Sequence, residues 1–367
     1  TKSDDQKLHF RYIKLTNFKS YSTAEFEFAD KLNLIFGLNG AGKTNLLDAI
    51  YCLAMTQSNF KVPDQQLIKI GQDFYRLEAG LVRKDEQHLI VIKSQKRAKK
   101  VIEKDEVAYQ KLAEHIGFIP IVMVAPDDLE LVTGGNSLRR TLIDRTISQV
   151  DRSYLKHSID YLRLLKQRNA LLKQFLEGRS YDEVLLTTYD EKMWVHADYI
   201  YRTRANFLAA FHPALNELYT ALCGGTESIS LIYENQVASR SYLEIAVENR
   251  ARDRLLGRST VGPHADKLSY IFEDRDMKLF GSQGQKKSAI FATKLAQYRY
   301  LVESSGLKPI LLLDDIFDRL DHERVGRLLG IILKDNFGQI FITDTEAGRL
   351  EKFLDSPTSG IKQFEIS

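Results

Sequence analysis

The sequence predicts an α/β fold, in which a mixed sheet covered by helices is interrupted by a mainly helical insertion. Short apolar runs alternate with helix-length segments at both ends of the chain, the order expected of helices packed on a sheet. One apolar run leads directly into a glycine-rich loop and a helix. In the middle of the chain, from Leu155 to Leu176, apolar residues recur at spacings of three, four or seven, which predicts a long amphipathic helix.

These patterns place the expected elements. Strands are expected over residues 8–15, 24–28, 32–36, 76–103 (a β region), 119–124, 229–233, 268–272, 310–313 and 339–343, and helices over 45–55, 155–176, 182–211, 285–303 and 325–333. Proline is unfavourable inside a helix, so Pro213 is expected to end the second long helix. We therefore expect a discontinuous first lobe of residues 1–130 and 255–367, and a helical insertion lobe of residues 131–254.

The composition is that of an ordinary globular protein. With 367 residues, 44% hydrophobic and 28% charged, the chain is long enough for about two domains. The net charge of +3 permits a nucleic-acid surface without requiring one. Two cysteines are too few for a disulfide framework, and no apolar run is long enough to cross a membrane. These features favour the cytoplasm.

The glycine-rich loop matches the phosphate-binding P-loop pattern G-x-x-x-x-G-K-[ST] in full, from Gly37 to Thr44 (GLNGAGKT). Gly37, Gly40 and Gly42 allow backbone N–H groups to surround phosphates at the start of a helix. Lys43 is expected to reach the β- and γ-phosphates, and the Thr44 hydroxyl to hold Mg²⁺. A plain glycine turn is the alternative, and the flanking strand and helix argue against it.

An acidic pair follows the apolar run 310–313. A P-loop needs a carboxylate at the end of a neighbouring strand to hold its metal, and Asp314 is in the expected position. Asp315 is the candidate general base or water-orienting group. The same pair could instead cap a helix N-terminus, but its combination with the P-loop favours the catalytic interpretation.

A third motif is the glycine-containing turn GSQGQKK, which spans residues 281–287 at the start of a helix. A helix start with a hydroxyl group and small residues is a second potential anion site. If this turn and the P-loop both bind phosphate, the turn of one subunit would close over the nucleotide of another. The simpler alternative is that Ser282 caps the helix.

The order of these motifs resembles that of ABC-type ATPase heads, and more narrowly that of the RecF family of bacterial DNA repair proteins. The matching stretches are LTNFKSY (15–21), GLNGAGKTNLLDAIY (37–51), PDDL (126–129), RRTLID (139–144), GPH (262–264), GSQGQKK (281–287) and LLLDDIFDRLD (311–321). They cover residues 15 to 321 in family order. One departure is that GPH is followed by Ala265, Asp266 and Lys267, where the family usually has Arg-Asp-Asp.

The resemblance implies an ABC-type P-loop ATPase head that uses ATP and Mg²⁺. It also implies a head-to-tail homodimer on gapped or single-strand/double-strand junction DNA, which helps RecO and RecR to load recombinase and hydrolyses ATP slowly. The implied site residues fall into four groups: catalytic Lys43, Asp315 and Thr343 (the switch position); ATP-binding Lys19, Gly37, Asn39, Gly40, Ala41, Gly42, Lys43, Thr44 and Asn45, with Thr44 and Asp314 on the metal; the signature Ser282, Gly284 and Gln285, which meets the partner's ATP; and Asp321, in the loop that couples the two sites.

Two basic stretches are candidates for DNA contact. Lys93, Lys96, Arg97, Lys99 and Lys100 cluster in the β region and would displace counterions from DNA phosphates; a solvated hairpin explains the same residues equally well. Arg139 and Arg140 are also candidates, with ion pairing on a helix surface as the alternative.

Two other functions are compatible with a P-loop. One is a small-molecule kinase, against which the turn at 281–287 and the sequence Asp318-Arg319-Leu320-Asp321 argue. The other is a nucleotide-gated DNA clamp with negligible turnover, which Asp315 favours because transporter ATPases commonly have Glu at this position.

Overall fold

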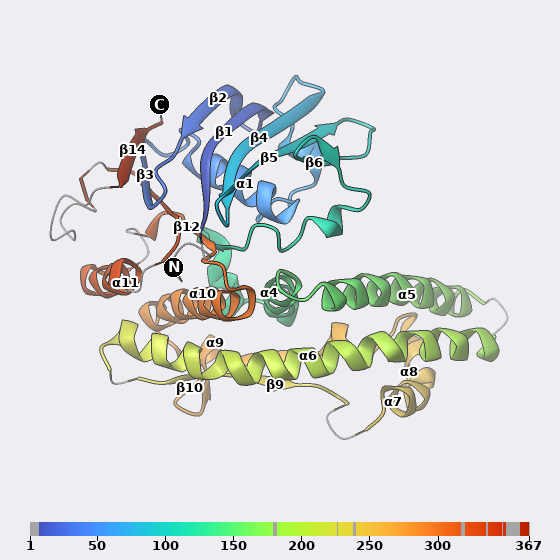
Figure 1. Ribbon diagram of the computed structural model, residues 1–367. Helices are drawn as coiled ribbons and strands as arrows, with labels where there is room; N and C mark the ends of the chain where they lie inside the picture. Colours follow the sequence, from blue (N-terminus) through green and yellow to red (C-terminus); the bar gives the residue numbers. More distant parts are fainter. Residues whose placement is uncertain are drawn as a thin grey trace. The chain divides into compact units, whose positions relative to one another are not determined.

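The computed structural model describes residues 7–178, 182–225, 227–237, 240–316, 320–334, 337–346, 348–349 and 360–366, drawn as coloured ribbon in Figure 1. The chain divides into two compact units. The first comprises residues 1–129, 218–227 and 282–367, and the second comprises residues 130–217 and 228–281. Asp318 and Arg319 of the predicted motif lie outside the described residues.

A parallel five-stranded sheet forms the base of the first unit. Its order is β14 (Ile361–Glu365), β3 (Leu32–Phe36), β13 (Ile340–Asp344), β12 (Ile310–Leu313) and β8 (Ile121–Val124). Strands β8 and β12 are buried along their whole length, as expected for parallel strands covered on both faces. Strand β14 was not expected from the sequence, because it is a partly exposed edge strand without a continuous apolar run.

An antiparallel sheet is the second layer of this unit. Its order is β2 (Tyr21–Glu27), β1 (Leu8–Phe18), β4 (Phe74–Arg83), β5 (Glu86–Gln95), β6 (Val101–Lys104) and β7 (Val107–Ala108). Helix α1 (Lys43–Met55) contacts β1, β4 and β5 of this sheet and also β8 and β13 of the parallel sheet. Eleven of its residues are buried, from Lys43 to Met55. A helix that is buried on nearly every side belongs in a core, so the start of α1 is held rigidly between the two sheets.

The remaining helices of the first unit are α2 (Asp64–Leu67), α10 (Gln283–Ser305) and α11 (His322–Lys334), with short 3-10 turns at Leu112–Glu114 and Pro126–Leu129. Helix α10 contacts β8, and Lys294 on α10 donates to the carbonyl of Met123 (2.7 Å) and pairs with Asp128 (3.0 Å). The helix that begins at the predicted signature is therefore fixed to the parallel sheet.

The second unit is mainly helical, as predicted. It contains α3 (Glu130–Thr133), α4 (Asn136–Ser148), α5 (Arg152–Leu176), most of α6 (Glu183–Cys223), α7 (Tyr242–Glu248), α8 (Arg250–Leu256), α9 (Met277–Phe280), a 3-10 turn at Pro263–Ala265 and a sheet of β11 (Arg275–Asp276), β10 (Lys267–Phe272) and β9 (Ile229–Glu234). Helices α5 and α6 run antiparallel. The buried Arg168 of α5 pairs with Asp190 of α6 (2.7 Å) and with Asp253 of α8 (2.7 Å).

Two expectations differ from the structure. Pro213 does not end the second long helix, because α6 continues through it to Cys223. Proline in a helix interior costs about 3 kcal/mol. Leu208 and Phe211 before it, and Leu215 and Leu218 after it, are buried, and their packing offsets that cost.

The second difference concerns the return of the chain to the first unit. It occurs at Ser282 rather than near residue 255. Strand β10 pairs with β9, and α8 contacts α5, so residues 228–281 share their core with the helical unit. Within the described residues, no helix is both long and apolar enough to span a membrane.

Candidate nucleotide site

The P-loop connects β3 to α1 and has the backbone geometry that its glycines predict. Gly37, Gly40 and Gly42 have φ values of 155°, 86° and 114°, all in the region that side chains disfavour. The Lys43 Nζ donates to the carbonyls of Gly37 (2.7 Å) and Leu38 (3.1 Å). The Lys43 side chain thus lies across the P-loop, the segment that is predicted to bind phosphates. Asn39 at the loop tip is exposed and Ala41 is half-buried.

The first glycine of the loop is required by a close approach of the backbone. A Cβ on Gly37 would lie 2.2 Å from the carbonyl oxygen of Ile366. Ile366 in turn donates its N–H to the carbonyl of Phe36 (2.9 Å). The segment that follows β14 therefore supports the start of the P-loop, a contact that the motif alone did not reveal.

Asp314, at the end of β12, is joined to the P-loop by a hydrogen bond. The Thr44 hydroxyl donates to its Oδ2 (2.9 Å), and the Thr343 hydroxyl at the end of β13 donates to its Oδ1 (2.7 Å). Asp314 is fully buried, and burial raises the pKa of its carboxyl, an effect that the two hydroxyl donors oppose. A hydroxyl and a buried carboxylate oxygen side by side are the ligand types that Mg²⁺ prefers, so Thr44 and Asp314 fit the predicted metal site.

Thr343, which the resemblance places at the switch position, contacts both residues of the acidic pair. Its hydroxyl donates to Asp314 and accepts the backbone N–H of Asp315 (2.9 Å), and its side chain is fully buried. The hydroxyl has only one proton to donate. In this arrangement Thr343 orients both residues of the acidic pair, Asp314 and Asp315. Asp315 has a positive φ of 50°, which is uncommon for a residue other than glycine and concentrates at functional sites.

The turn between β1 and β2 packs against the P-loop and carries the predicted Lys19. The Tyr21 hydroxyl donates to the carbonyl of Gly42 (3.0 Å), and the Asn45 side chain donates to the hydroxyl of Ser20 (2.8 Å). Lys19 pairs with Asp48 of α1 (2.6 Å). Sequence reasoning missed Asp48, which is one helical turn after Thr44 and is fully buried.

The predicted signature residues form a second cluster in the first unit, at the start of α10. Ser282 is the N-cap residue: its hydroxyl accepts the backbone N–H of Gln285 (3.2 Å), and the side-chain Oε1 of Gln285 accepts the backbone N–H of Ser282 (2.8 Å). This reciprocal capping box fixes the conformation of the turn. The Gln285 amide also donates to Glu227 (2.9 Å), so one glutamine links the helix start to the segment that follows α6.

Arg324 of α11 links two residues that the resemblance assigns to different motifs. Its Nη1 pairs with Asp321 (2.7 Å). A Cβ on Gly284 would lie 2.4 Å from the same nitrogen. The guanidinium therefore occupies the space that the glycine leaves beside the signature turn. Neither Glu227 nor Arg324 was predicted, because neither belongs to a motif that sequence reasoning had assigned to nucleotide.

The basic stretch of the β region is largely compensated by carboxylates. Lys93 pairs with Glu103 (2.8 Å), Lys96 with Asp73 (3.0 Å) and Lys100 with Asp64 (2.5 Å). Arg97 and Lys99, in the hairpin between β5 and β6, are exposed. Among the described residues of this stretch, these two are exposed without an ion pair, whereas Lys93 and Lys96 are exposed but paired.

Arg139 does not have the exposure that a DNA contact needs. It is buried, and its Nη1 donates to the carbonyls of Leu131 (2.7 Å) and Gly134 (3.3 Å) at the end of α3. It satisfies backbone acceptors that a helix C-terminus leaves unpaired. Arg140 is half-buried, and its Nη1 donates to the carbonyl of Asp266 (2.5 Å).

The P-loop, the acidic strand end and the serine-capped signature helix on one parallel sheet define an ABC-type ATPase head with an inserted helical unit. The family model described as the RecF/RecN/SMC N terminal domain matches residues 9–363. The DNA replication and repair protein RecF of Flavobacterium johnsoniae is 40% identical over 359 residues, covering 98% of this chain and 100% of that protein. That of Bacteroides fragilis is 39% identical over 355 residues, covering 96% and 95%. The chain belongs to the RecF family of DNA replication and repair proteins.

Solved structures agree with this assignment. The recombination mediator protein RecF with ATP, of the RecFOR pathway, is similar with a TM-score of 0.88 at 27% identity, covering 98% of this chain and 96% of that one. The Smc head domain of Pyrococcus furiosus, bound to the C-terminal domain of ScpA, is similar with a TM-score of 0.54 at 16% identity, covering 92% and 90%. The second similarity concerns the fold alone.

Proposed function

We propose that this protein is an ATP-gated, DNA-binding ATPase that dimerises head-to-tail around two nucleotides. The observation that carries the proposal is the hydrogen bond between Thr44 and Asp314, because it brings the P-loop and the acidic strand end together as one site. Lys43, the loop glycines and Lys19 would bind the phosphates of ATP. Thr44 and Asp314 would hold Mg²⁺, which supplies charge neutralisation at the phosphates.

The second cluster supports the proposed dimer. Ser282, Gly284 and Gln285 form a helix N-terminus with a capping hydroxyl and a glycine, which is suited to an anion. In this proposal that anion is the nucleotide of a second copy, and Asp321 couples the two sites through Arg324. The structure of the relative with ATP in the RecFOR pathway supports nucleotide binding by this chain.

Family membership supports the choice of DNA and partners. The dimer would recognise gapped or single-strand/double-strand junction DNA and help RecO and RecR to load recombinase in the cytoplasm. Arg97 and Lys99 are exposed and have no ion pair among the described residues, so they are the first candidates for DNA contact in the predicted basic stretch. The small-molecule kinase interpretation does not fit this family.

The arrangement around Thr343 supports slow turnover in this proposal. Its hydroxyl is used between Asp314 and Asp315, so Asp315 would orient the attacking water without help from a base at position 343. This favours weak ATP hydrolysis, stimulated by DNA, that releases the dimer. It also supports the second candidate, a nucleotide-gated clamp with negligible turnover.

The experiment that tests the function is ATP-dependent binding to gapped, duplex and single-stranded DNA at several salt concentrations. We expect ATP to strengthen binding to the gapped substrate most, and Lys43→Arg to remove the effect of ATP. Equal binding with and without ATP on every substrate would contradict the proposal. Measuring ATP turnover in the same samples separates a weak ATPase from a clamp.

A further inference from the structure

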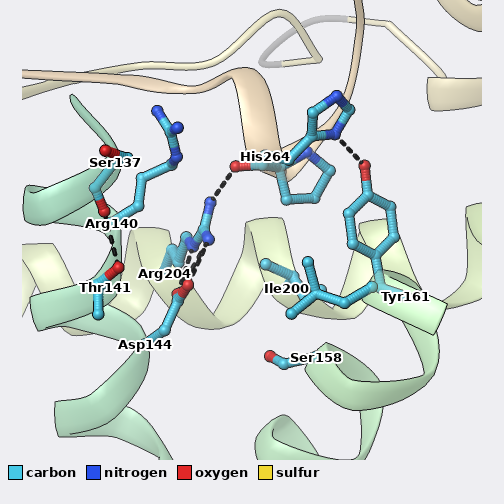
Figure 2. Close-up of a pocket in the computed structure, with 11 residues that line it drawn as sticks. Ser137, Arg140, Thr141, Asp144, Ser158, Tyr161, Ile200, Arg204 and His264 are labelled. Atoms are coloured by element: carbon cyan, nitrogen blue, oxygen red, sulfur yellow. Dashed lines mark hydrogen bonds and ion pairs between the residues drawn. The ribbon is translucent and has the colours of Figure 1, made fainter. Parts of the chain in front are cut away.

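Two of the stretches shared with the RecF family lie outside the nucleotide site and converge in the second unit. Arg139 to Asp144 belong to α4, and Gly262 to His264 precede β10. They are more than a hundred positions apart in the sequence, yet both line one cavity of about 230 Å³. Figure 2 shows it with Arg140, Thr141 and Asp144 on one side and Tyr161 and His264 on the other. The proposed ATPase function uses none of these residues.

The walls of the cavity are mostly fixed by contacts within the protein. Arg204 is buried, and its three nitrogens donate to Asp144, to Asp266 (2.7 Å) and to the carbonyl of Pro263 (2.8 Å). Tyr154 also donates to Asp144 (2.5 Å). The carboxylate of Asp144 is thus neutralised by Arg204, and neither group is free for a ligand.

His264 is likewise part of the wall. Its Nδ1 accepts the Tyr161 hydroxyl (2.6 Å), and its Nε2 donates to the carbonyl of Ser259 (3.2 Å). Burial lowers the pKa of His264, so the ring is neutral near pH 7. It shapes the cavity without offering a charge.

Three polar groups keep hydrogen-bonding capacity toward the cavity. The Arg140 Nη1 donates to the carbonyl of Asp266. The N–H groups of its Nε and Nη2 have no hydrogen-bond acceptor among the described residues and can therefore bind a ligand. The hydroxyl of Ser137 is exposed at the rim. The Ser158 Oγ is buried with no hydrogen-bond partner among the described residues, and a buried unpaired hydroxyl is costly unless something binds to it.

Apolar side chains make up the rest of the lining: Leu162 of α5, Ile200 of α6 and Pro263. Leu162 is 57% exposed, and Ile159, one turn before it, is 47% exposed. Residues three apart on a helix share a face, so the apolar surface continues from the cavity onto α5.

This chemistry favours a protein partner over DNA. A DNA-binding surface relies on several uncompensated cations, whereas this cavity offers one, Arg140, among apolar walls. The volume is smaller than that of pockets for drug-sized ligands and suits one or two side chains. We infer that the cavity between α4, α5, α6 and the 262–264 turn is a docking site for a partner protein's acidic–apolar segment. An apolar side chain enters beside Ile200, and an adjacent carboxylate pairs with Arg140.

Methyl NMR titration of the full chain, observing Ile200, tests this inference. The probes are the blocked peptides acetyl-Glu-Leu-amide and acetyl-Glu-Phe-amide, and their matched Gln analogues. We expect saturable shifts at Ile200 with the Glu peptides, and binding of the Gln analogues weaker by about tenfold, because they lack the charged partner of Arg140.

Three variants sharpen the test. Arg140→Gln should abolish the preference for Glu over Gln. Ser158→Leu should fill the cavity and weaken all four peptides. Arg163→Gln removes an exposed arginine of α5 (side chain 66% exposed) and should change nothing. If Arg140→Gln does not fold, the comparison of Glu and Gln peptides on the unmodified protein still tests whether a peptide carboxylate contributes to binding.

Several results would overturn the inference. They are the absence of saturable shifts at Ile200, equal binding of the Glu and Gln peptides, or shifts at Ile200 produced instead by a single-stranded or duplex oligonucleotide. Reduced self-association of Ser158→Leu would assign the cavity to a second copy and overturn it as well. Because the cavity lies in the second unit and the nucleotide site in the first, failure here leaves the ATPase proposal unaffected.

Discussion

The Thr343 hydroxyl donates to Asp314 at 2.7 Å and accepts the backbone N–H of Asp315 at 2.9 Å. One buried hydroxyl thus fixes both residues of the acidic pair. Its only proton is used on Asp314, so Thr343 acts through its neighbours.

Thr343→Val should lower the ATP turnover rate and leave nucleotide affinity nearly unchanged, because the P-loop contacts remain. The lost hydrogen bonds should reduce the free energy of unfolding by about 1–3 kcal/mol. Turnover assays, nucleotide titration and urea unfolding measure the three quantities. Thr343→Ser keeps the hydroxyl and is the control that should retain most of the turnover. A Thr343→Val protein with unchanged turnover would refute the positioning role.

Gly284→Ala should reduce ATP-dependent dimerisation while the monomer stays folded. The new Cβ would lie 2.4 Å from the Arg324 Nη1, so the guanidinium must move and its pair with Asp321 is disturbed. Sedimentation velocity with and without ATP measures the effect. Gly330→Ala in α11 is the matched control, since a Cβ there meets nothing within 4 Å. Equal dimer content in both variants would show that Arg324 does not couple the two motifs.

Glu227→Ala should weaken the dimer without weakening nucleotide binding to the monomer. It removes the partner of the Gln285 amide (2.9 Å), which then has freedom to leave the capping box at Ser282. Fluorescent-nucleotide titration and sedimentation separate the two effects. Glu303→Ala, which changes an exposed glutamate of α10, the helix that contains Gln285, should have no effect on either quantity. Loss of nucleotide affinity in the Glu227 variant would contradict this prediction.

Substitutions of the arginines and lysines proposed for DNA contact should fall into two groups, those that change stability and those that change the salt dependence of DNA binding. Arg139→Ala should lower the free energy of unfolding by about 2–3 kcal/mol, because it leaves the carbonyls at the end of α3 unpaired, and should not alter the salt dependence of DNA binding. Arg97→Ala with Lys99→Ala should leave stability unchanged and reduce the slope of log K against log salt by about 2. An unchanged slope would remove the β5–β6 hairpin from the DNA surface.

Stability should depend on pH through Asp266. Burial raises the pKa of Asp266 from 3.8 to about 6. The folded state keeps this proton to higher pH than the unfolded state does. The contribution of the protonated Asp266 carboxyl to the free energy of unfolding is therefore complete below pH 3.8, the usual pKa of the group, and is lost as the pH rises through about 6. The free energy of unfolding, relative to Asp266→Asn, should fall by about 2–3 kcal/mol across that window. Asp198→Asn, with an exposed side chain on α6, is the control. Parallel pH profiles of wild type and Asp266→Asn would contradict this account.

Local signals were sufficient to predict the P-loop and the acidic strand end. The loop from Gly37 to Thr44 has its own backbone requirement, and Asp314 follows directly from a fully apolar strand. The signature turn was visible for the same reason, because a serine cap and its glutamine partner are three residues apart. Such features depend on residues that are close together in the sequence, so they can be predicted without knowledge of tertiary contacts.

Features that depend on distant residues could not be predicted. The sequence left two interpretations of the β-region lysines open, a DNA-binding surface and a solvated hairpin. It did not reveal that Lys96 and Lys100 pair with Asp73 and Asp64, which precede β4 along the chain. Pro213 was expected to end a helix, because a local rule does not account for the packing on both sides of it. The role of Glu227 depends on its contact with the Gln285 side chain, a residue 58 positions away in the sequence, so no local pattern indicates it.

The central claim is that the P-loop of one subunit is completed by the signature turn of another. Sedimentation velocity with ATP tests it by mixing two variants, Lys43→Arg and Ser282→Arg, each of which should remain monomeric alone. A mixed pair joins the intact P-loop of the Ser282 variant to the intact signature of the Lys43 variant, so the account predicts that mixing restores ATP-dependent dimers. If the mixture sediments as monomers while the wild type dimerises under the same conditions, the composite site is contradicted.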